Sequence, residues 1–383
     1  MAGVSAAVAA AREGASVALV ERYGFMGGQA TGGLVIKLCS TSDGRKMITR
    51  GICKDIVDRL RLTKSARGYP LIDIDPEALK YQLDLYTEEN GIQVILHALA
   101  VGAVFENRNL HSIIIESKSG REVIAGTVFI DATGDADTAR WCNLDFEMQP
   151  RESVRPTSLV YTMCNVDIDT AAKFMRSNKR TWKALRREAR TNGFSPEWMP
   201  TTQPGHVWMD DLFVEGVDGT SRADLQRAEV EGRRKTQLLS RFYAERMPGF
   251  EEAFLAQTAS QIGVRETRRI LGRYVLGVED LQERKSFPDS IGRANNPYHG
   301  AGVSFQIPLR CLLPRAAANL LVAGRCISVQ HEILDYIRDI PVCMVTGQGA
   351  GTAAALACDA GGNTEKIQMK SLQKALEAAG ALI

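Results

Sequence analysis

The sequence predicts an α/β protein whose first domain contains a parallel sheet and is interrupted by an inserted α+β domain. Three observations predict this class: an Ala-rich helix at residues 2–13 followed by the apolar run Ser16–Val20, a return to short apolar strands and a Gly/Ala-rich helix after Phe305, and a middle segment of different composition. A short apolar run next to a helix is typical of a buried parallel strand. We therefore expect the first domain at residues 1–150 and 289–383, and the inserted domain at residues 151–288.

Local signals place the elements of the first domain. Gly14 ends the first helix, and Asp75 with Pro76 begins another that runs to about Asn90. A helix is also expected around Ile52–Arg61. Turn residues separate four predicted strands: Gln93–Leu96, Ala100–Phe105, Ser112–Glu116 and Val123–Ile130. Amphipathic helices are predicted at Ala223–Arg246 in the insert and at Thr364–Ala379 in the tail.

Composition excludes several classes of protein. With 47 basic and 45 acidic residues the net charge is +2, so nucleic acid is not an expected partner, and the basic run between Lys179 and Arg187 is expected to be a solvated helix face. None of the eight cysteines forms a CxxC pair, so no metal site is expected, and the thiols are typical of a reduced, cytoplasmic protein. No apolar run approaches the roughly 18 residues of a membrane span.

A spacing pattern at the start of the chain predicts nucleotide binding. Gly3-x3-Ala7-x6-Gly14-x2-Val17-x3-Glu21 follows the second half of the Rossmann dinucleotide fingerprint. Gly3 takes the place of the third glycine, and Glu21 ends the second strand, where a carboxylate can accept the ribose hydroxyls. The alternative is an Ala-rich helix before an ordinary strand. The fingerprint begins with a strand and two more glycines, so we expect Met1 to be an internal residue of the phosphate loop.

Three further segments carry a resemblance. The first is the glycine-rich loop Glu21–Thr31, with Arg22, Gly27 and Gly28; the second is Phe129–Asp137, with Thr133, Gly134 and Asp135. The third joins Asn319–Ser328, with Gly324 and Arg325, to Pro341–Gly351, with Gly347, Gln348, Gly349 and Ala350. Together these segments resemble the FAD-dependent oxidoreductase family, whose members share the glutathione-reductase-type FAD fold.

The resemblance implies that FAD is the cofactor and that these residues contact it. The loop after Glu21 would run beside the ribityl chain and flavin ring, and Asp135 would hold a hydroxyl. Many flavoproteins have an acid on the ribityl chain where this chain has Arg325, and the family more often has Ala at Gly349. The helix starting near Pro341 would point its positive end at the flavin pyrimidine edge.

Candidates for the chemistry follow from position and residue type. His331 comes shortly after the strand expected to reach the flavin, and its side chain suits proton transfer near neutral pH. A core histidine held by hydrogen bonds is the equal alternative. Arg265 and Arg268 could anchor a substrate carboxylate, although ion pairs with Glu266 and with acids of the first domain are the alternative.

The expected function is oxidation or reduction of a small organic substrate by hydride transfer to or from flavin N5. A nicotinamide-dependent dehydrogenase would also use Glu21, but would have no role for Gly324–Gly351. A non-catalytic flavoprotein remnant or electron-transfer subunit is the other alternative. Partners beyond the small-molecule substrate are not expected, except further copies of the chain in a homo-oligomer.

Overall fold

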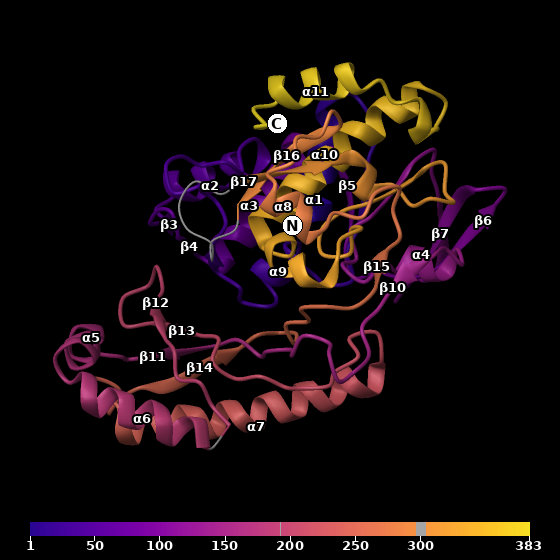
Figure 1. Ribbon diagram of the computed structural model, residues 1–383. Coiled ribbons are helices and arrows are strands. Elements are labelled where there is room, and N and C mark those ends of the chain that lie inside the picture. Colours follow the sequence, from indigo (N-terminus) through magenta and orange to yellow (C-terminus); the bar gives the residue numbers. More distant parts are fainter. Residues whose placement is uncertain (192, 296–303) are drawn as a thin grey trace.

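The computed structural model describes residues 1–191, 193–295 and 304–383 (Figure 1), and its first domain contains two parallel strand pairs. β1 (Ala18–Val20) pairs with β5 (Gln93–Ile95), and β9 (Phe129–Asp131) pairs with β18 (Leu320–Val322). The second pair joins the segments that precede and follow the insert. Among the described residues, no strand pairing links β1 with β9. The mixed α/β class predicted from the sequence is confirmed.

Helices α1 (Ala2–Arg12) and α10 (Ile340–Asp359) pack closely against each other beside these strands. A Cβ atom on Gly347 would lie 2.2 Å from the Ala2 carbonyl oxygen, and one on Gly351 would lie 2.1 Å from that of Ala6. The two glycines therefore allow the two helix backbones to touch. By length and composition α10 could cross a membrane, although no membrane span was predicted from the sequence. Inside the protein, however, 89% of its most apolar 18-residue segment is buried. α10 is therefore positioned as a core helix.

A three-stranded antiparallel sheet lies beside the parallel pairs. It contains β6 (Leu99–Glu106), β7 (Asn109–Ser117) and β8 (Gly120–Ala125). The single strand predicted at Val123–Ile130 is wrong, because β8 ends at Ala125 and β9 begins at Phe129. Gly126 lies in the break, where a Cβ atom would come within 3.1 Å of the Phe129 ring. The predicted turns are confirmed, with positive φ at Asn107 and Gly120.

Most of the predicted helices are confirmed. α2 spans Ile52–Leu62 and α3 spans Pro76–Glu89, with the Asp75 carboxylate accepting from the Glu77 and Ala78 amides at 2.9 and 3.0 Å. The tail helix is shorter than predicted: α11 spans Met369–Ala378, and residues 364–366 form a separate 3-10 turn capped by Asn363. The remaining elements of the first and last segments are β2 (Lys37–Leu38), β3 (Ala66–Arg67), β4 (Ile72–Ile74), α4 (Asp137–Trp141), β16 (Ser290–Asn295), β17 (Ser304–Pro308) and α9 (Leu334–Ile337).

The middle of the chain forms a separate layer, here called the cap. Its sheet has the strand order β12-β13-β11-β14. Beside the sheet lie three helices, α5 (Ile168–Ser177), α6 (Lys179–Thr191) and α7 (Arg222–Arg246) (Figure 1). The strands span Met199–Pro200, Val207–Met209, Tyr161–Cys164 and Phe254–Thr258 in that order. After the cap, β15 (Arg269–Ile270) pairs with β10 (Phe146–Glu147), and α8 (Val278–Gln282) follows.

The cap is also fixed to the first domain through β12 and β13. The Trp208 indole donates to the Leu34 carbonyl at 2.7 Å, and the Arg67 and Lys37 side chains donate to the carbonyls of Thr201 and Pro200. The Lys37 amine also pairs with Asp73 at 2.7 Å. The cap therefore has contacts with the first domain at this hairpin in addition to the two chain connections.

A buried carboxyl group inside the cap gives a pH-dependent stability. Asp211 is 1% exposed and accepts from the Tyr243 hydroxyl at 2.9 Å, and burial raises the pKa of Asp211 to about 8. The folded protein therefore holds a proton that the unfolded chain releases, so stability is lost as pH rises from about 4 to about 8. We expect Asp211→Asn to abolish this loss, which amounts to a few kcal/mol, and to be more stable than the wild type at pH 8.

Urea unfolding followed by tryptophan fluorescence at several pH values measures this effect, because Trp182, Trp198 and Trp208 all lie in the cap. Parallel pH dependence in the wild type and in Asp211→Asn would rule out a buried protonated Asp211. Asp210→Asn is the matched control, since Asp210 is a neighbouring carboxylate that is paired with Arg265.

Candidate functional site

Segments that are far apart in the sequence meet at the first turn of α1. A Cβ atom on Gly3 would lie 3.3 Å from that of Ala132, and one on Gly324 would lie 3.2 Å from that of Ala2. The Met1 amino nitrogen is 3.9 Å from the Cβ position of Gly28. The structure thus brings together the fingerprint, the loop after β1, the loop after β9 and the end of β18. This convergence defines the candidate site.

The amino group of Met1 is buried at the start of α1. Burial lowers the pKa of this amino group, while Cys343 and Glu21 act to raise it. The first amides of a helix favour an anion. This position therefore has the polarity that a phosphate group requires.

The loop after β1 requires glycine at two predicted cofactor positions. Gly27 and Gly28 have φ of 110° and 55°, and a Cβ atom on Gly27 would come within 2.6 Å of the Thr31 side chain. Glu21 accepts from the Tyr23 amide at 3.1 Å, and Arg22 donates to the Gln261 side chain at 2.9 Å. Arg22 therefore links this loop to the segment that follows β14.

The loop after β9 is organised around Asp131. This carboxylate is 2% exposed and accepts from the amides of Thr133 and Thr138 at 2.9 and 3.0 Å. Gly134 follows with a φ of 80°, and Asp135 pairs with Arg325 at 2.6 Å. Arg325 stands where many flavoproteins have an acidic residue. Here it pairs with an acidic residue of the loop after β9, Asp135. Arg325 also has a buried nitrogen, Nη1, without a partner among the described residues.

Asp137 lies at the first position of α4, beside this loop. Burial, followed by the charges of Asp135 and Asp131, raises the pKa of Asp137 to about 6, although Arg268 pairs with it at 3.0 Å. Arg268 is thus held by an acid of the first domain. Arg265 pairs with Asp210 of the cap at 3.2 Å and donates to the Pro156 carbonyl at 3.0 Å. Both predicted arginines are in ion pairs, and Arg268 has the first-domain partner that the alternative expected, whereas Arg265 is paired with an acid of the cap.

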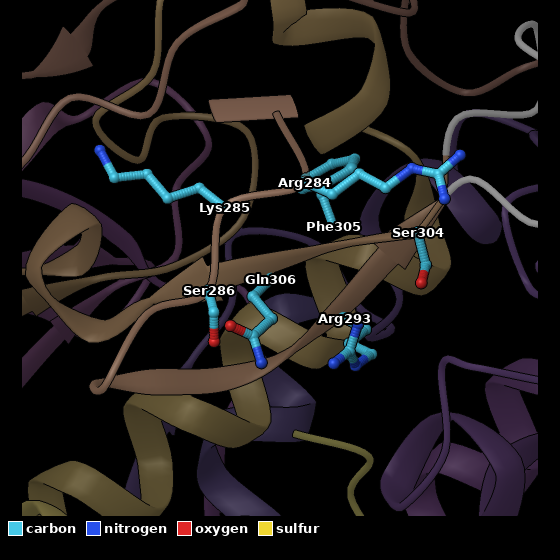
Figure 2. Close-up of a pocket in the computed structure, with 7 residues that line it drawn as sticks. All are labelled: Arg284, Lys285, Ser286, Arg293, Ser304, Phe305 and Gln306. Atoms are coloured by element: carbon cyan, nitrogen blue, oxygen red, sulfur yellow. The ribbon is translucent and has the colours of Figure 1, made fainter. Parts of the chain in front are cut away.

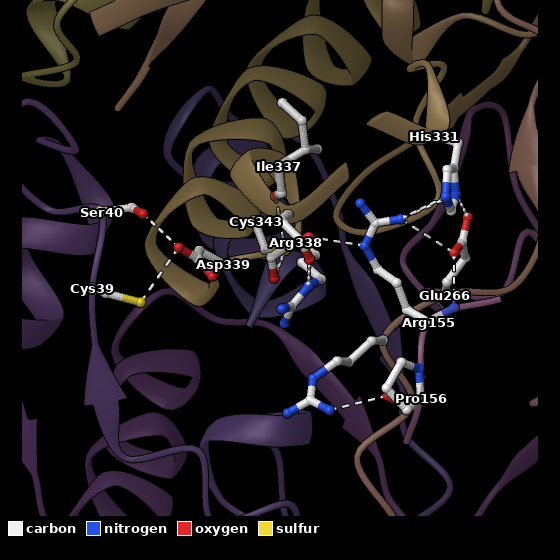
Figure 3. Close-up of polar contacts among 12 residues, drawn as sticks. Cys39, Ser40, Arg155, Pro156, Glu266, His331, Ile337, Arg338, Asp339 and Cys343 are labelled. Carbon is white, nitrogen blue, oxygen red and sulfur yellow. Dashed lines mark hydrogen bonds and ion pairs between the residues drawn. The ribbon is translucent and has the colours of Figure 1, made fainter. Parts of the chain in front are cut away.

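The four predicted residues of α10 lie inside this helix, after its first turn. Gly347 packs against α1, Gly349 faces Ile291, and Ala350 is fully buried. The Gln348 side chain accepts from the Ile52 amide at 3.0 Å, which caps α2. Gly347, Gly349 and Ala350 are thus in packing contacts, and Gln348 is in a hydrogen bond with α2. The residues at the positive end of α10 are instead Asp339 to Cys343, where Asp339 accepts from the Cys39 thiol at 3.3 Å (Figure 3).

His331 belongs to a polar cluster between the cap connections and α9 (Figure 3). Its Nδ1 lies 2.7 Å from Glu266, whose side chain is completely buried and also pairs with Arg269 at 2.5 Å. Arg155 contacts both nitrogens of the His331 ring at 3.0 and 3.2 Å, and it pairs with Asp335 at 2.9 Å. His331 was predicted from the sequence, whereas Arg155 and Asp335 were not, and Glu266 was expected only as an ion-pair partner of the arginines.

A surface hollow lies elsewhere. It has a volume of about 230 Å³ beside β16 and β17, and basic residues Arg284, Lys285 and Arg293 line it together with Gln306 (Figure 2). Lys285 is tied to Asp280 at 3.0 Å, and Arg293 donates to the Ile383 carbonyl at 3.1 Å. None of the predicted site residues lines this hollow.

The residues at the candidate site fit FAD. The start of α1 offers free helix amides to phosphate, Glu21 offers carboxylate oxygens to ribose, and Arg325 has a buried donor without a partner among the described residues. Gly27, Gly28, Gly134 and Gly324 all have positive φ, which lets the backbone come close to a flat ligand. This set of donors and acceptors matches the alternating ribose, phosphate and ring groups of a flavin dinucleotide.

Comparison with known proteins defines the class. Residues 1–376 match the family described as FAD dependent oxidoreductase. The protein therefore belongs to the FAD-dependent oxidoreductase family, and its cofactor is FAD. Among the curated proteins none matches this sequence significantly.

Solved structures support the fold. A geranylgeranyl bacteriochlorophyll reductase-like protein from Thermoplasma acidophilum is similar with a TM-score of 0.52 and 13% identity, over 98% of this chain and 81% of that one. The myxobacterial chondrochloren halogenase CndH, an FAD-dependent halogenase, has a TM-score of 0.51 and 12% identity, over 98% and 76%. BexE, which is involved in oxidation during BE-7585A biosynthesis, has a TM-score of 0.52 and 12% identity, over 99% and 67%. At these identities the likeness concerns the fold alone.

Proposed function

We propose that the protein binds FAD across the first turn of α1 and uses it to oxidise or reduce a small organic substrate, in the cytoplasm. The convergence of Gly3, Gly28, Ala132 and Gly324 on this turn is the observation that carries the proposal. When bound, FAD supplies hydride transfer at flavin N5. The chain's own residues hold the cofactor, exclude water and move a proton.

Particular residues would hold each part of the cofactor. Glu21 would accept the adenosine ribose hydroxyls, and the amides at the start of α1 would face the phosphates. Arg325, with its buried donor, would lie beside the ribityl chain, and the positive end of α10 would face the flavin pyrimidine edge. His331 is the candidate for proton transfer, at the side of the site where the cap connections meet α9.

A glutathione-reductase-type arrangement of the sheet remains a prediction, as does the position of Met1 within the phosphate loop. Two observations support these predictions. Among the described residues, β1 and β9 each pair on one edge only. Gly3 of α1 lies next to both strand pairs, since its Cβ position faces Leu19 and Ala132. A parallel strand between β1 and β9 that leads into α1 would complete the sheet. The reading frame upstream of Met1 tests this: an encoded apolar strand followed by Gly-x-Gly supports it, and its lack would contradict it.

Removal of the ribose-binding carboxylate should weaken FAD binding. We expect Glu21→Ala to raise the FAD dissociation constant by roughly tenfold to a hundredfold, because a hydrogen bond to a charged group contributes about 1.5–3 kcal/mol. Glu13→Ala, at an exposed carboxylate near the end of α1, should leave it unchanged. Flavin fluorescence titration measures both variants. An unchanged dissociation constant for Glu21→Ala would remove Glu21 from the site.

Anaerobic reduction of the bound flavin by candidate substrates tests the reaction itself. Bleaching of the flavin absorbance by an organic substrate without added nicotinamide nucleotide supports the proposed function. Turnover that requires only nicotinamide nucleotide and no flavin would favour a dehydrogenase. FAD binding without reduction by any substrate or reductant would favour a non-catalytic role.

A further inference from the structure

The outer helices of the cap concentrate positive charge. α6 and α7 cover the face of the cap sheet that is turned away from the first domain, and we call this side of the molecule the outer face (Figure 1). The basic run that was predicted to be a solvated helix face lies in α6, whose single acidic residue is Glu188. The basic side chains of α6 are Lys179, Arg180, Lys183, Arg186, Arg187 and Arg190. The net charge of the whole chain is only +2, so negative charge elsewhere in the molecule balances this helix.

The basic side chains share one side of α6. At about 100° per residue they fall within an arc of roughly 120°, whereas Ala189 and Trp182 on another side pack into the hydrophobic core. Arg186 has a long ion pair with Glu197 at 3.5 Å, and Glu188 pairs with Arg246 of α7 at 2.5 Å. The remaining basic side chains of α6 are exposed and have no hydrogen bond or ion pair among the residues that the structure describes.

This arrangement is unfavourable for the helix itself. Lys179, Lys183 and Arg187 follow each other at intervals of four residues, so their like charges repel along one side of α6. Lys179 and Arg180 also lie in the first turn, where the positive end of the helix dipole disfavours cations, and this turn contains no acid. Within the described part of the chain, no acidic side chain offsets the repulsion among these three exposed lysines and arginines and Arg180. An anionic surface outside the chain would offset it.

α7 adds apolar groups to the outer face. Val230, Arg234, Leu238 and Arg241 are spaced by four, four and three residues, which places them on one side of this helix. Val230 and Leu238 are 40% and 57% exposed, and both arginines are exposed as well. Aliphatic side chains flanked by arginines suit a membrane interface, because the aliphatic groups enter the acyl boundary while the guanidinium groups stay with the lipid phosphates. The phosphate backbone of a nucleic acid offers no comparable environment to Leu238.

We propose that the outer face of the cap binds a membrane surface that contains anionic lipids. The basic side chains of α6 and α7 supply the attraction to the lipid phosphates, and Val230 and Leu238 enter the interface. The inference does not depend on the proposed function. Because the outer face lies on the far side of the cap from α1, a bound membrane leaves the candidate site uncovered (Figure 1).

Cosedimentation with lipid vesicles tests the proposal. We expect the protein to bind vesicles in which about a third of the phosphatidylcholine is replaced by phosphatidylglycerol, to bind pure phosphatidylcholine vesicles little, and to dissociate as salt screens the charges. The variant that combines Lys179→Gln, Lys183→Gln and Arg187→Gln should partition roughly a hundredfold less, because each basic side chain near an anionic surface contributes about fivefold. This variant should be at least as stable as the wild type in urea, since like charges are removed from one side of α6.

The matched control combines Lys118→Gln, Lys370→Gln and Lys374→Gln, which removes the same charge from exposed positions of the first domain. It should bind the anionic vesicles as the wild type does. Leu238→Ser should weaken partitioning several-fold although the charge is unchanged. No binding to the anionic vesicles, an equal loss in the two triple variants, or unchanged partitioning of Leu238→Ser would each overturn the proposal. Tighter binding to a DNA duplex than to the vesicles, lost in the α6 variant, would also overturn it and assign the outer face to nucleic acid.

Discussion

Gly351→Val should destabilise the first domain by at least about 3 kcal/mol. The Cβ of the new side chain would lie 2.1 Å from the Ala6 carbonyl oxygen and 2.8 Å from the Ala9 Cβ. These neighbours are helix backbone and a methyl group, so no side chain can rotate away. The whole of α1 would have to move from α10, and with it the turn on which the candidate site converges. Urea unfolding followed by circular dichroism measures the loss.

The control for this prediction is Cys358→Val on the same helix, where the side chain is only partly buried and the added volume is small. It should change stability by less than about 1 kcal/mol. Equal stability of Gly351→Val and the wild type would mean that α1 and α10 do not pack as described.

Glu266→Ala should cost about 3–5 kcal/mol of stability, because removal of one partner leaves buried charge unpaired. Arg269 is 1% exposed and donates to Glu266 and to the Val329 carbonyl at 3.0 Å. Without the carboxylate its guanidinium keeps the hydrogen bond to Val329, but among the described residues its charge is then paired only with Glu147, at 3.5 Å. The same substitution also releases His331 and Arg155.

Glu147→Ala is the matched control, since Glu147 pairs with the same Arg269 but is 51% exposed. A change of about 0.5 kcal/mol or less is expected there. Thermal unfolding of both variants measures the two stability changes. Similar losses of stability in Glu266→Ala and Glu147→Ala would show that burial of the Glu266–Arg269 pair is not the cause of the effect.

Local signals were sufficient for the elements that depend on neighbouring residues. The cap of α3 by Asp75, the positive φ of Gly14 at the end of α1, and the turns at Asn107 and Gly120 follow from residue type alone. The split between β8 and β9 was missed because Val123–Ile130 is mostly apolar, although Gly126 and Thr127 interrupt it; the pairing of β8 with β7 stops at Ala125. Periodicity cannot distinguish one strand from two in such a run.

Contacts between distant residues were the part that could not be predicted. Arg155 and Glu266 are separated by the whole cap, and neither lies in a spacing pattern that would associate it with His331. Gln348 is in a motif, but its side chain is used to cap α2 because the fold places Ile52 beside it. A signal for Glu266 was its position among three arginines, which is equally typical of a surface.

The most direct test of the account is the cofactor content of the protein purified from its complete reading frame. Denaturation and chromatography should release FAD in an equimolar amount, with neither FMN nor nicotinamide nucleotide, and Glu21→Ala should release less. Protein that is folded by circular dichroism, carries no flavin and binds no added FAD would contradict the account.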